Sequence, residues 1–248
     1  MHIFAHRGLS GAYPENTMAS FKAAVDTDCY GIELDVQLSK DGEVVIIHDE
    51  TINRTTNRNG FVRDFTLSEL QSFNASKLHT LAAAKEYIPT FYEYCSFIKK
   101  HKQITNVELK SGVFYYEGLE EKTLKIITDF GLEDRILFSS FNPLSLIRIQ
   151  QLMPKILGKN KPVIPCALLT GSAIDNVGAL CRQNGFVAWH PGLHQLNKKH
   201  IKERVLNCHD NGIEVNVWTV NKVHDYNRLK KAGVDGVFTN FSKKFSSL

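Results

Sequence analysis

Long apolar segments are missing from this sequence, and no hydrophobic run approaches the roughly 20 residues that a membrane-spanning helix needs. The glycine-rich signatures of nucleotide enzymes are also missing, because neither G-x-G-x-x-G nor G-x-x-x-x-G-K-S/T occurs. There is no G-x-S-x-G elbow of the kind that presents a nucleophilic serine. These absences argue against a transmembrane protein, a dinucleotide or P-loop enzyme, and a serine hydrolase of the α/β type.

Cysteine is scarce and forms no paired motif. The five residues are Cys29, Cys95, Cys166, Cys181 and Cys208. An odd number of cysteines without C-x-x-C spacing predicts buried thiols in a reducing compartment. The sequence opens directly on a strand-like segment with no apolar leader before it, so we expect a cytoplasmic protein.

Charge of one sign is not concentrated anywhere in the chain. The net charge is +4, and the lysines and arginines are spread along the sequence. A nucleic-acid-binding face normally gathers its basic residues. We therefore expect a small-molecule partner, with no nucleic acid and no integral membrane segment. The sequence does not indicate an oligomeric state.

What the chain does contain is a regular alternation of strand-like and helical segments. The strand-like segments cover residues 1–5, 31–36, 105–109, 136–139, 163–169, 185–189, 213–218 and 234–238. The helical patterns between them cover residues 15–27, 120–130, 144–153, 174–183, 198–211 and 224–232. Eight strands separated by helices predict a parallel sheet, and most simply a closed (β/α)8 TIM barrel that forms a single domain over 1–248.

The interval between the second and third barrel strands breaks this alternation. A turn signal at 40–43 precedes a further apolar strand at 44–47, and residues 51–87 are polar with little periodicity. We predict a small insertion here, over approximately 49–104. Insertions in TIM barrels usually extend the loops on the active-site face.

Two carboxylates end the second predicted strand. Glu33 and Asp35 share one face of it, because residues two apart in a strand point the same way. Converging carboxylates repel each other unless a cation or a proton lies between them. A hard divalent ion with oxygen ligands, Mg²⁺ or Ca²⁺, satisfies this arrangement. The alternative, which spacing alone leaves open, is a pair of salt bridges to lysines or arginines.

The third predicted strand ends with the same spacing. Glu108 and Lys110 lie two residues apart, so Glu108 is a possible third oxygen ligand and Lys110 a point charge for a phosphate. An E-x-K pattern alone is weak, since surface strands often carry one. It gains weight because neighbouring strands of a barrel end around one pocket.

Three further side chains near the start of the chain suit phosphate chemistry. Two of them are His6 and His48, and because an unperturbed imidazole titrates near neutral pH, either one is a candidate to give or take a proton. Arg7 offers a planar donor fork for phosphate oxygens, although a salt bridge at the barrel rim would also explain it. Single histidines are more often structural, but two that flank a carboxylate pair favour catalysis.

These residues lie in segments that resemble the glycerophosphodiester phosphodiesterase family from the first strand to the last. The matching segments are AHRGLSGAYPENT (5–17), GIELDVQLSKDGEVVIIHD (31–49), RTTNRNG (54–60), VELK (107–110), VNVWTVN (215–221) and AGVDGVFTN (232–240). The family fold is a TIM barrel with a small insertion after strand two, in agreement with the strand count. One departure is Asn240, where the family more often has aspartate.

The resemblance implies a role for each of these residues. His6 and His48 are expected to form the acid–base pair, and the divalent ion is expected to bind Glu33, Asp35 and Glu108. Phosphate contacts are implied for Arg7 and Lys110. The resemblance also places Trp218 against the glycerol or the rim of the metal site, with a core tryptophan as the alternative, and Phe141 at the same mouth.

The expected reaction is metal-dependent hydrolysis of glycerophosphodiesters to glycerol 3-phosphate and an alcohol. The nucleophile is either water or the substrate's own glycerol hydroxyl, and the sequence does not say which histidine is the acid. A second possibility keeps the site but takes a lipid phosphodiester, as in lysophospholipase D-like cleavage. A third is a non-catalytic barrel that binds phosphorylated ligands.

Overall fold

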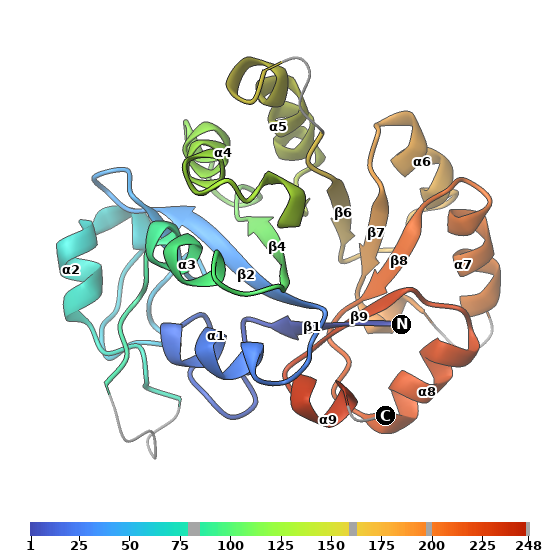
Figure 1. The fold of residues 1–248 in the computed structure, drawn as a ribbon, viewed down its shortest axis with the longest axis horizontal. Helices are drawn as coiled ribbons and strands as arrows, with labels where there is room; N and C mark the ends of the chain where they lie inside the picture. Colours follow the sequence, from blue (N-terminus) through green and yellow to red (C-terminus); the bar gives the residue numbers. More distant parts are fainter. Residues whose placement is uncertain (79–84, 159–162, 197–199, 247–248) are drawn as a thin grey trace.

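A closed parallel barrel forms the centre of the protein (Figure 1). The computed structural model describes residues 1–78, 85–158, 163–196 and 200–246. Within these residues the barrel strands are β1 (His2–His6), β2 (Gly31–Leu38), β4 (Ile104–Leu109), β5 (Ile136–Ser140), β6 (Cys166–Thr170), β7 (Ala188–Pro191), β8 (Glu214–Val217) and β9 (Gly236–Thr239). Because β1 pairs in parallel with both β2 and β9, the sheet closes on itself. The predicted (β/α)8 barrel is confirmed.

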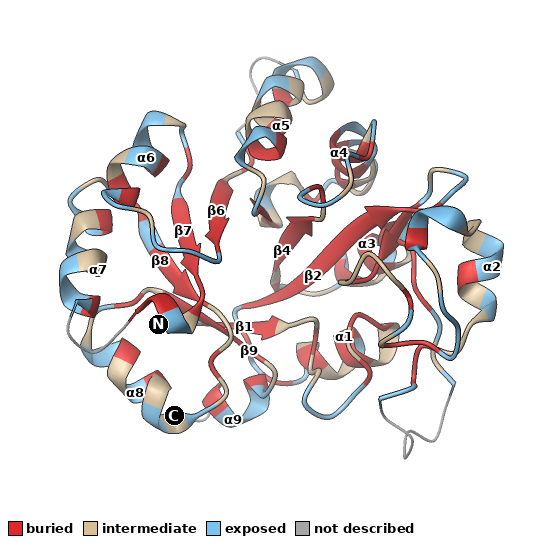
Figure 2. Ribbon diagram, turned by 180° about the vertical axis from the view of Figure 1, so that it is seen from behind, coloured by how far each residue is buried: buried red, intermediate tan, exposed pale blue. Residues whose placement is uncertain are grey.

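Helices surround the barrel and turn their buried faces towards it, while their outer faces are exposed (Figure 2). They are α1 (Met18–Val25), α3 (Phe91–Ile98), α4 (Leu119–Phe130), α5 (Pro143–Ile156), α6 (Val177–Gln183), α7 (Ile201–His209), α8 (Val223–Lys231) and α9 (Ser242–Ser246), with short 3-10 turns η2 (Glu133–Arg135) and η3 (Leu193–Gln195). The predicted helices are present with shifted ends. The helix expected over 198–211 is observed as α7, and residues 197–199 lie outside the described residues. In the described part of the chain, no helix has both the length and the apolar character required to cross a bilayer.

Strand β2 shows how the alternating pattern divides the two faces of the barrel wall. Ile32, Leu34 and Val36 belong to the main hydrophobic core between the strands and the helices. The intervening side chains, Glu33 and Asp35, therefore point into the barrel, as the period of two predicts. The polar side chains of β2 therefore face the inside of the barrel, and apolar packing on the other face of the strand stabilises the barrel wall.

The segment after β2 folds back before the barrel resumes. Strand β3 (Val44–Ile46) pairs antiparallel with β2. Beyond it lie η1 (Val62–Asp64) and α2 (Leu67–Ser72), and the segment has a small hydrophobic core of its own. Helix α3, which the sequence patterns did not indicate, packs into the main barrel core.

Candidate active site

A cavity of about 370 Å³ opens inside the barrel, at the end where the strands terminate. One side of it is polar and comes mainly from β1, β2, β4 and the loop after β3: His6, Arg7, Glu33, His48, Glu108 and Lys110. The rest of the lining is more apolar and includes Phe141, Leu169, Trp218 and Phe238. The cavity is thus divided between a charged half and an apolar half.

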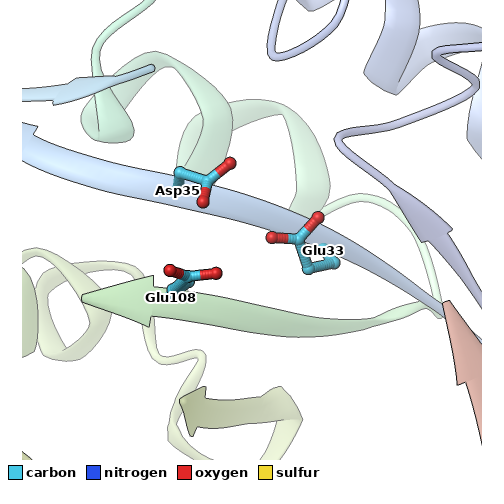
Figure 3. Close-up of side chains that lie close together, drawn as sticks. All are labelled: Glu33, Asp35 and Glu108. Atoms are coloured by element: carbon cyan, nitrogen blue, oxygen red, sulfur yellow. The ribbon is translucent and has the colours of Figure 1, made fainter. Parts of the chain in front are cut away.

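Three carboxylates from two neighbouring strands converge at this cavity (Figure 3). Glu33, Asp35 and Glu108 each offer an oxygen, and these oxygens all lie within 4.8 Å of one another. The register of β2 and β4 explains the convergence, because Asp35 pairs directly with Glu108. All three side chains are buried, and Asp35 is completely enclosed behind the cavity wall.

The protonation of this triad is uneven. Burial raises the pKa of Glu33 well above its usual value, and the nearby charge of Asp35 raises it further. Burial likewise raises the pKa of Glu108. Burial would also raise the pKa of Asp35, but the charges of His48, Arg7 and Lys110 outweigh it and hold that pKa below its usual range. The triad therefore favours some added positive charge, either protons or a cation.

A divalent cation fits this set of donors. Carboxylate oxygens are hard ligands of the kind that Mg²⁺ and Ca²⁺ prefer. Asp35 Oδ1 is buried and has no hydrogen-bond partner in the described part of the protein, which suits an oxygen that binds a cation. Lys110 Nζ lies 3.0 Å from Glu108 Oε1 and 4.0 Å from Asp35 Oδ1, so salt bridges only partly neutralise the cluster.

Two residues with a left-handed backbone hold the carboxylates from the β1–α1 loop. Arg7 and Asn16 both have a φ of 56°, which is unusual for residues other than glycine. The backbone N–H of Arg7 donates to Glu33 Oε2 at 2.8 Å, and the Asn16 side chain donates to Asp35 Oδ2 at 2.9 Å. Strained backbone of this kind is typical of functional sites, where the surrounding structure holds it in place.

His6 has a neutral partner. Its Nδ1 donates to Asn240 Oδ1 at 2.7 Å, and Asn221 in turn accepts from the backbone N–H of Asn240. Because an amide oxygen only accepts, this bond places a proton on Nδ1 and leaves Nε2 as the lone-pair nitrogen of the neutral ring. Burial and the charge of Arg7 lower the pKa of His6 to about 3.

His48 has an ionised partner. Its Nδ1 donates to Asp49 Oδ1 at 2.6 Å. The hydrogen bond from His48 and two from Arg54 hold the pKa of Asp49 below its usual range. Arg54 also donates twice to Glu15, at 2.7 Å each, and Glu15 accepts from Arg7 at 2.7 Å. A chain of alternating charges thus joins the His48 loop to the β1–α1 loop.

Two aromatic rings contact each other in the apolar half of the cavity. Phe141 and Trp218 pack edge to face with their ring centroids 5.6 Å apart. The indole N–H of Trp218 donates to the backbone oxygen of His190 at 2.8 Å, which orients the ring. Both side chains line the cavity, so Trp218 is not enclosed in the core as the alternative interpretation required.

The structure brings all the residues singled out in the sequence around one cavity, with Asp35 just behind its wall. Arg7 forms the salt bridge to Glu15 that was its alternative explanation and also lines the cavity. The partners of the histidines, Asn240 and Asp49, were not assigned a role from the sequence. The signal for Asp49 was its position directly after His48; the signal for Asn240 was its departure from the family pattern.

Comparison with known proteins adds a second line of observation. The model of the glycerophosphoryl diester phosphodiesterase family matches residues 6–244. Over 245 residues the chain is 39% identical to a glycerophosphodiester phosphodiesterase of Caldanaerobacter subterraneus, a match that covers 96% of this chain and 93% of that protein. It is 38% identical over 240 residues to a glycerophosphodiester phosphodiesterase of Bacillus altitudinis, covering 96% and 94% of the two chains.

A solved structure is similar over the whole chain. It is that of a phosphodiesterase of Oleispira antarctica in complex with the product sn-glycerol-3-phosphate, with a TM-score of 0.84 and 28% identity. The similarity covers 100% of this chain and 96% of that one.

Proposed function

This chain belongs to the glycerophosphoryl diester phosphodiesterase family and is a phosphoric diester hydrolase, and we propose that it cleaves glycerophosphodiesters with a divalent cation and two histidines. The products are glycerol 3-phosphate and an alcohol. The observation that carries this proposal is the convergence of the triad Glu33, Asp35 and Glu108 with both histidines around one cavity. Family membership sets aside the non-catalytic barrel as an alternative.

The proposed cation site is the triad itself. Mg²⁺ or Ca²⁺ bound there supplies positive charge for the phosphate oxygens as negative charge develops on them. Arg7 and Lys110 line the same half of the cavity and donate to the phosphate from the protein side. The charges of Glu108 and Asp35 outweigh the effect of burial and raise the pKa of Lys110 to about 12, so it stays protonated at neutral pH.

The unequal partners of the two histidines support a division of labour. Neutral His6, with its lone pair on Nε2, accepts the proton of the attacking hydroxyl as the new O–P bond forms. We assign the other proton transfer to His48: its Nδ1 faces the Asp49 carboxylate, and its Nε2–H gives a proton to the leaving alkoxide as the old P–O bond breaks. The attacking hydroxyl belongs either to water or to the glycerol of the substrate.

The apolar half of the cavity positions the carbon skeleton of the substrate. Trp218 and Phe141 belong to the apolar part of the lining, so the glycerol backbone packs against them while the phosphate faces Arg7 and Lys110. We place the whole chain in one domain and propose that the insertion at approximately 49–104 shapes the entrance. The five buried free thiols support the cytoplasm as the location.

The test of this proposal is an assay of glycerol 3-phosphate release from a panel of glycerophosphodiesters, with and without EDTA. We expect release from at least one substrate, its loss on chelation, and its return when Mg²⁺ or Ca²⁺ is added back. Release that is unaffected by EDTA would contradict the metal requirement. No release from any substrate, with metal restored, would contradict the substrate class.

One observation also favours the second candidate, a phosphodiester whose alcohol carries an apolar chain. A second cavity of about 410 Å³ adjoins the first one, and the two share Phe141 and Leu169. None of its described lining residues is charged. Its apolar wall consists mainly of Phe141, Ile147, Leu168, Leu169, Leu180 and Phe186. An accessible apolar cavity beside a catalytic one is suited to the hydrocarbon part of a ligand.

Chain length of the alcohol tests this candidate. Across a series of glycerophosphoalkanols we expect kcat/KM to rise by about fourfold for each methylene that becomes buried, because burial of one methylene stabilises by about 0.8 kcal/mol. Leu180→Glu, at a partly exposed position, should flatten the series. The matched control is Leu206→Glu on α7, which is also exposed and does not line the cavity. A flat series in the wild-type protein would contradict the candidate.

A further inference from the structure

One polar side chain on β2 is fully enclosed and belongs to no part of the machinery described above. Gln37 has no exposed surface, and it follows Glu33 and Asp35 on the same face of the strand. Its Nε2 donates to the backbone oxygens of Ile47, His48 and Asp49, at 3.0, 3.2 and 2.8 Å. A single side-chain amide therefore contacts the carbonyls of three consecutive residues centred on His48.

The hydrogen bonds of Gln37 bring three backbone acceptors close to one another. Three carbonyl oxygens that converge on one point repel one another, and a buried carbonyl without a donor destabilises the fold. The amide has two hydrogens, so the shorter bonds to Ile47 and Asp49 hold the ends while the longer contact to His48 is shared. Without this amide, the backbone at His48 would turn its carbonyls elsewhere.

The other end of the amide is fixed as well. Gln37 Oε1 accepts from the hydroxyl of Tyr116 at 3.0 Å, and Tyr116 is buried in the loop between β4 and α4. This bond sets the orientation of the amide, since Oε1 faces a donor and Nε2 faces acceptors. The loop that follows Lys110 thus orients the group that holds His48.

We propose that Gln37 is the positioning residue for His48. Gln37 fixes the backbone of His48 relative to the carboxylates of the same strand, and Asp49 fixes the ring. Both constraints are needed because His48 lies in a loop beyond β3 and its imidazole is partly exposed. The inference rests on the proposed function of His48 as the proton donor to the leaving group, and it adds the side chain that keeps the donor in place.

The experiment compares two leaving groups in the metal-loaded enzyme. One substrate releases an alkanol, which requires a proton, and the other releases p-nitrophenol, which leaves as the phenolate. For Gln37→Glu, which replaces the donors with acceptors at the same shape, we expect kcat for the alkanol substrate to fall by about 10²-fold, the usual cost of misplacing a catalytic group. For the p-nitrophenyl substrate we expect a loss of less than about threefold, because no acid is needed there. KM and the metal concentration for half-activation should stay within about twofold, since contacts to substrate and cation are unchanged.

Two further variants keep the inference testable if Gln37→Glu folds poorly. Gln37→Met removes the donors without adding charge and should show the same leaving-group pattern, whereas Tyr116→Phe removes only the orienting bond and should show it weakly. The matched control is Gln103→Glu, another buried glutamine whose Nε2 donates to a backbone carbonyl, that of Val25, away from the cavity. Gln103→Glu should lower the rates with the alkanol and the p-nitrophenyl substrate equally, or lower neither.

His48→Ala separates the two proposals. If His48→Ala shows the leaving-group pattern and the Gln37 variants lose both rates equally, Gln37 is merely structural and the inference is wrong. If His48→Ala itself lacks the pattern, the role proposed for His48 is wrong, and the inference is overturned with it.

Discussion

Removing His48 is expected to abolish turnover of an ordinary glycerophosphodiester and to spare an activated one. For His48→Ala we expect kcat with an alkanol leaving group to fall by roughly 10³-fold, within the range that general acid catalysis contributes. With p-nitrophenol as the leaving group, most of that loss should disappear, because the phenolate departs without a proton. The comparison is made on purified protein with the cation present in excess.

His6→Ala should behave differently because its proposed task precedes the departure of the leaving group. As the base, His6 is needed whichever alcohol leaves, so we expect losses of roughly 10³-fold with both substrates. Circular dichroism and the thermal midpoint should match the wild type for both variants. If instead His6→Ala is rescued by the better leaving group and His48→Ala is not, the two roles are reversed.

The partners of the two histidines explain why this asymmetry is expected. His6 donates to the neutral amide of Asn240, whereas His48 donates to a carboxylate that two arginine contacts keep ionised. A carboxylate balances the positive charge of an imidazolium, and an amide does not. Asn240→Asp would place a carboxylate opposite His6 Nδ1, so it should make the partners of the two histidines alike.

The sequence predicted the barrel and the triad because both follow from local patterns. Alternation of strands and helices fixes a parallel barrel, and the i, i+2 spacing of Glu33 and Asp35 fixes the face they share. Asp35 and Glu108 meet because β2 and β4 pair in register, which follows once the strands are known to be neighbours. These are short-range rules applied to strongly periodic segments.

What the sequence did not predict depends on contacts between distant segments. Asn240 reaches His6 across 234 positions in the chain, through the closure of the barrel at β1 and β9. Gln37 acts through loop carbonyls whose directions no residue pattern encodes. Helix α3 was missed although Thr90 and Glu93 form a capping box at its start, since the segment follows a long region with little periodicity.

Binding of the cation at the triad should have the second large effect, a rise in the thermal midpoint that depends on the triad carboxylates. In the wild-type protein, saturating Mg²⁺ or Ca²⁺ at 100 times the dissociation constant should stabilise the fold by about 2.7 kcal/mol. For a chain of this size, that raises the thermal midpoint by roughly 5–10 °C. Both Glu33→Gln and Asp35→Asn should lose this response together with nearly all activity, because each removes a ligand oxygen's charge.

Without the cation, the two variants should move in opposite directions. Burial and the charge of Asp35 raise the pKa of Glu33, so the metal-free fold loses stability as the pH rises from the usual 4.5 through that raised pKa. Glu33→Gln removes this penalty and should raise the midpoint of the metal-free protein at pH 7. Asp35 instead compensates Arg7 and Lys110 and has a lowered pKa, so Asp35→Asn should reduce the midpoint. If both variants keep the wild-type response to the cation, the cation binds elsewhere and the triad is not its site. Equal midpoints of the two metal-free variants would contradict the opposite effects expected from Glu33 and Asp35.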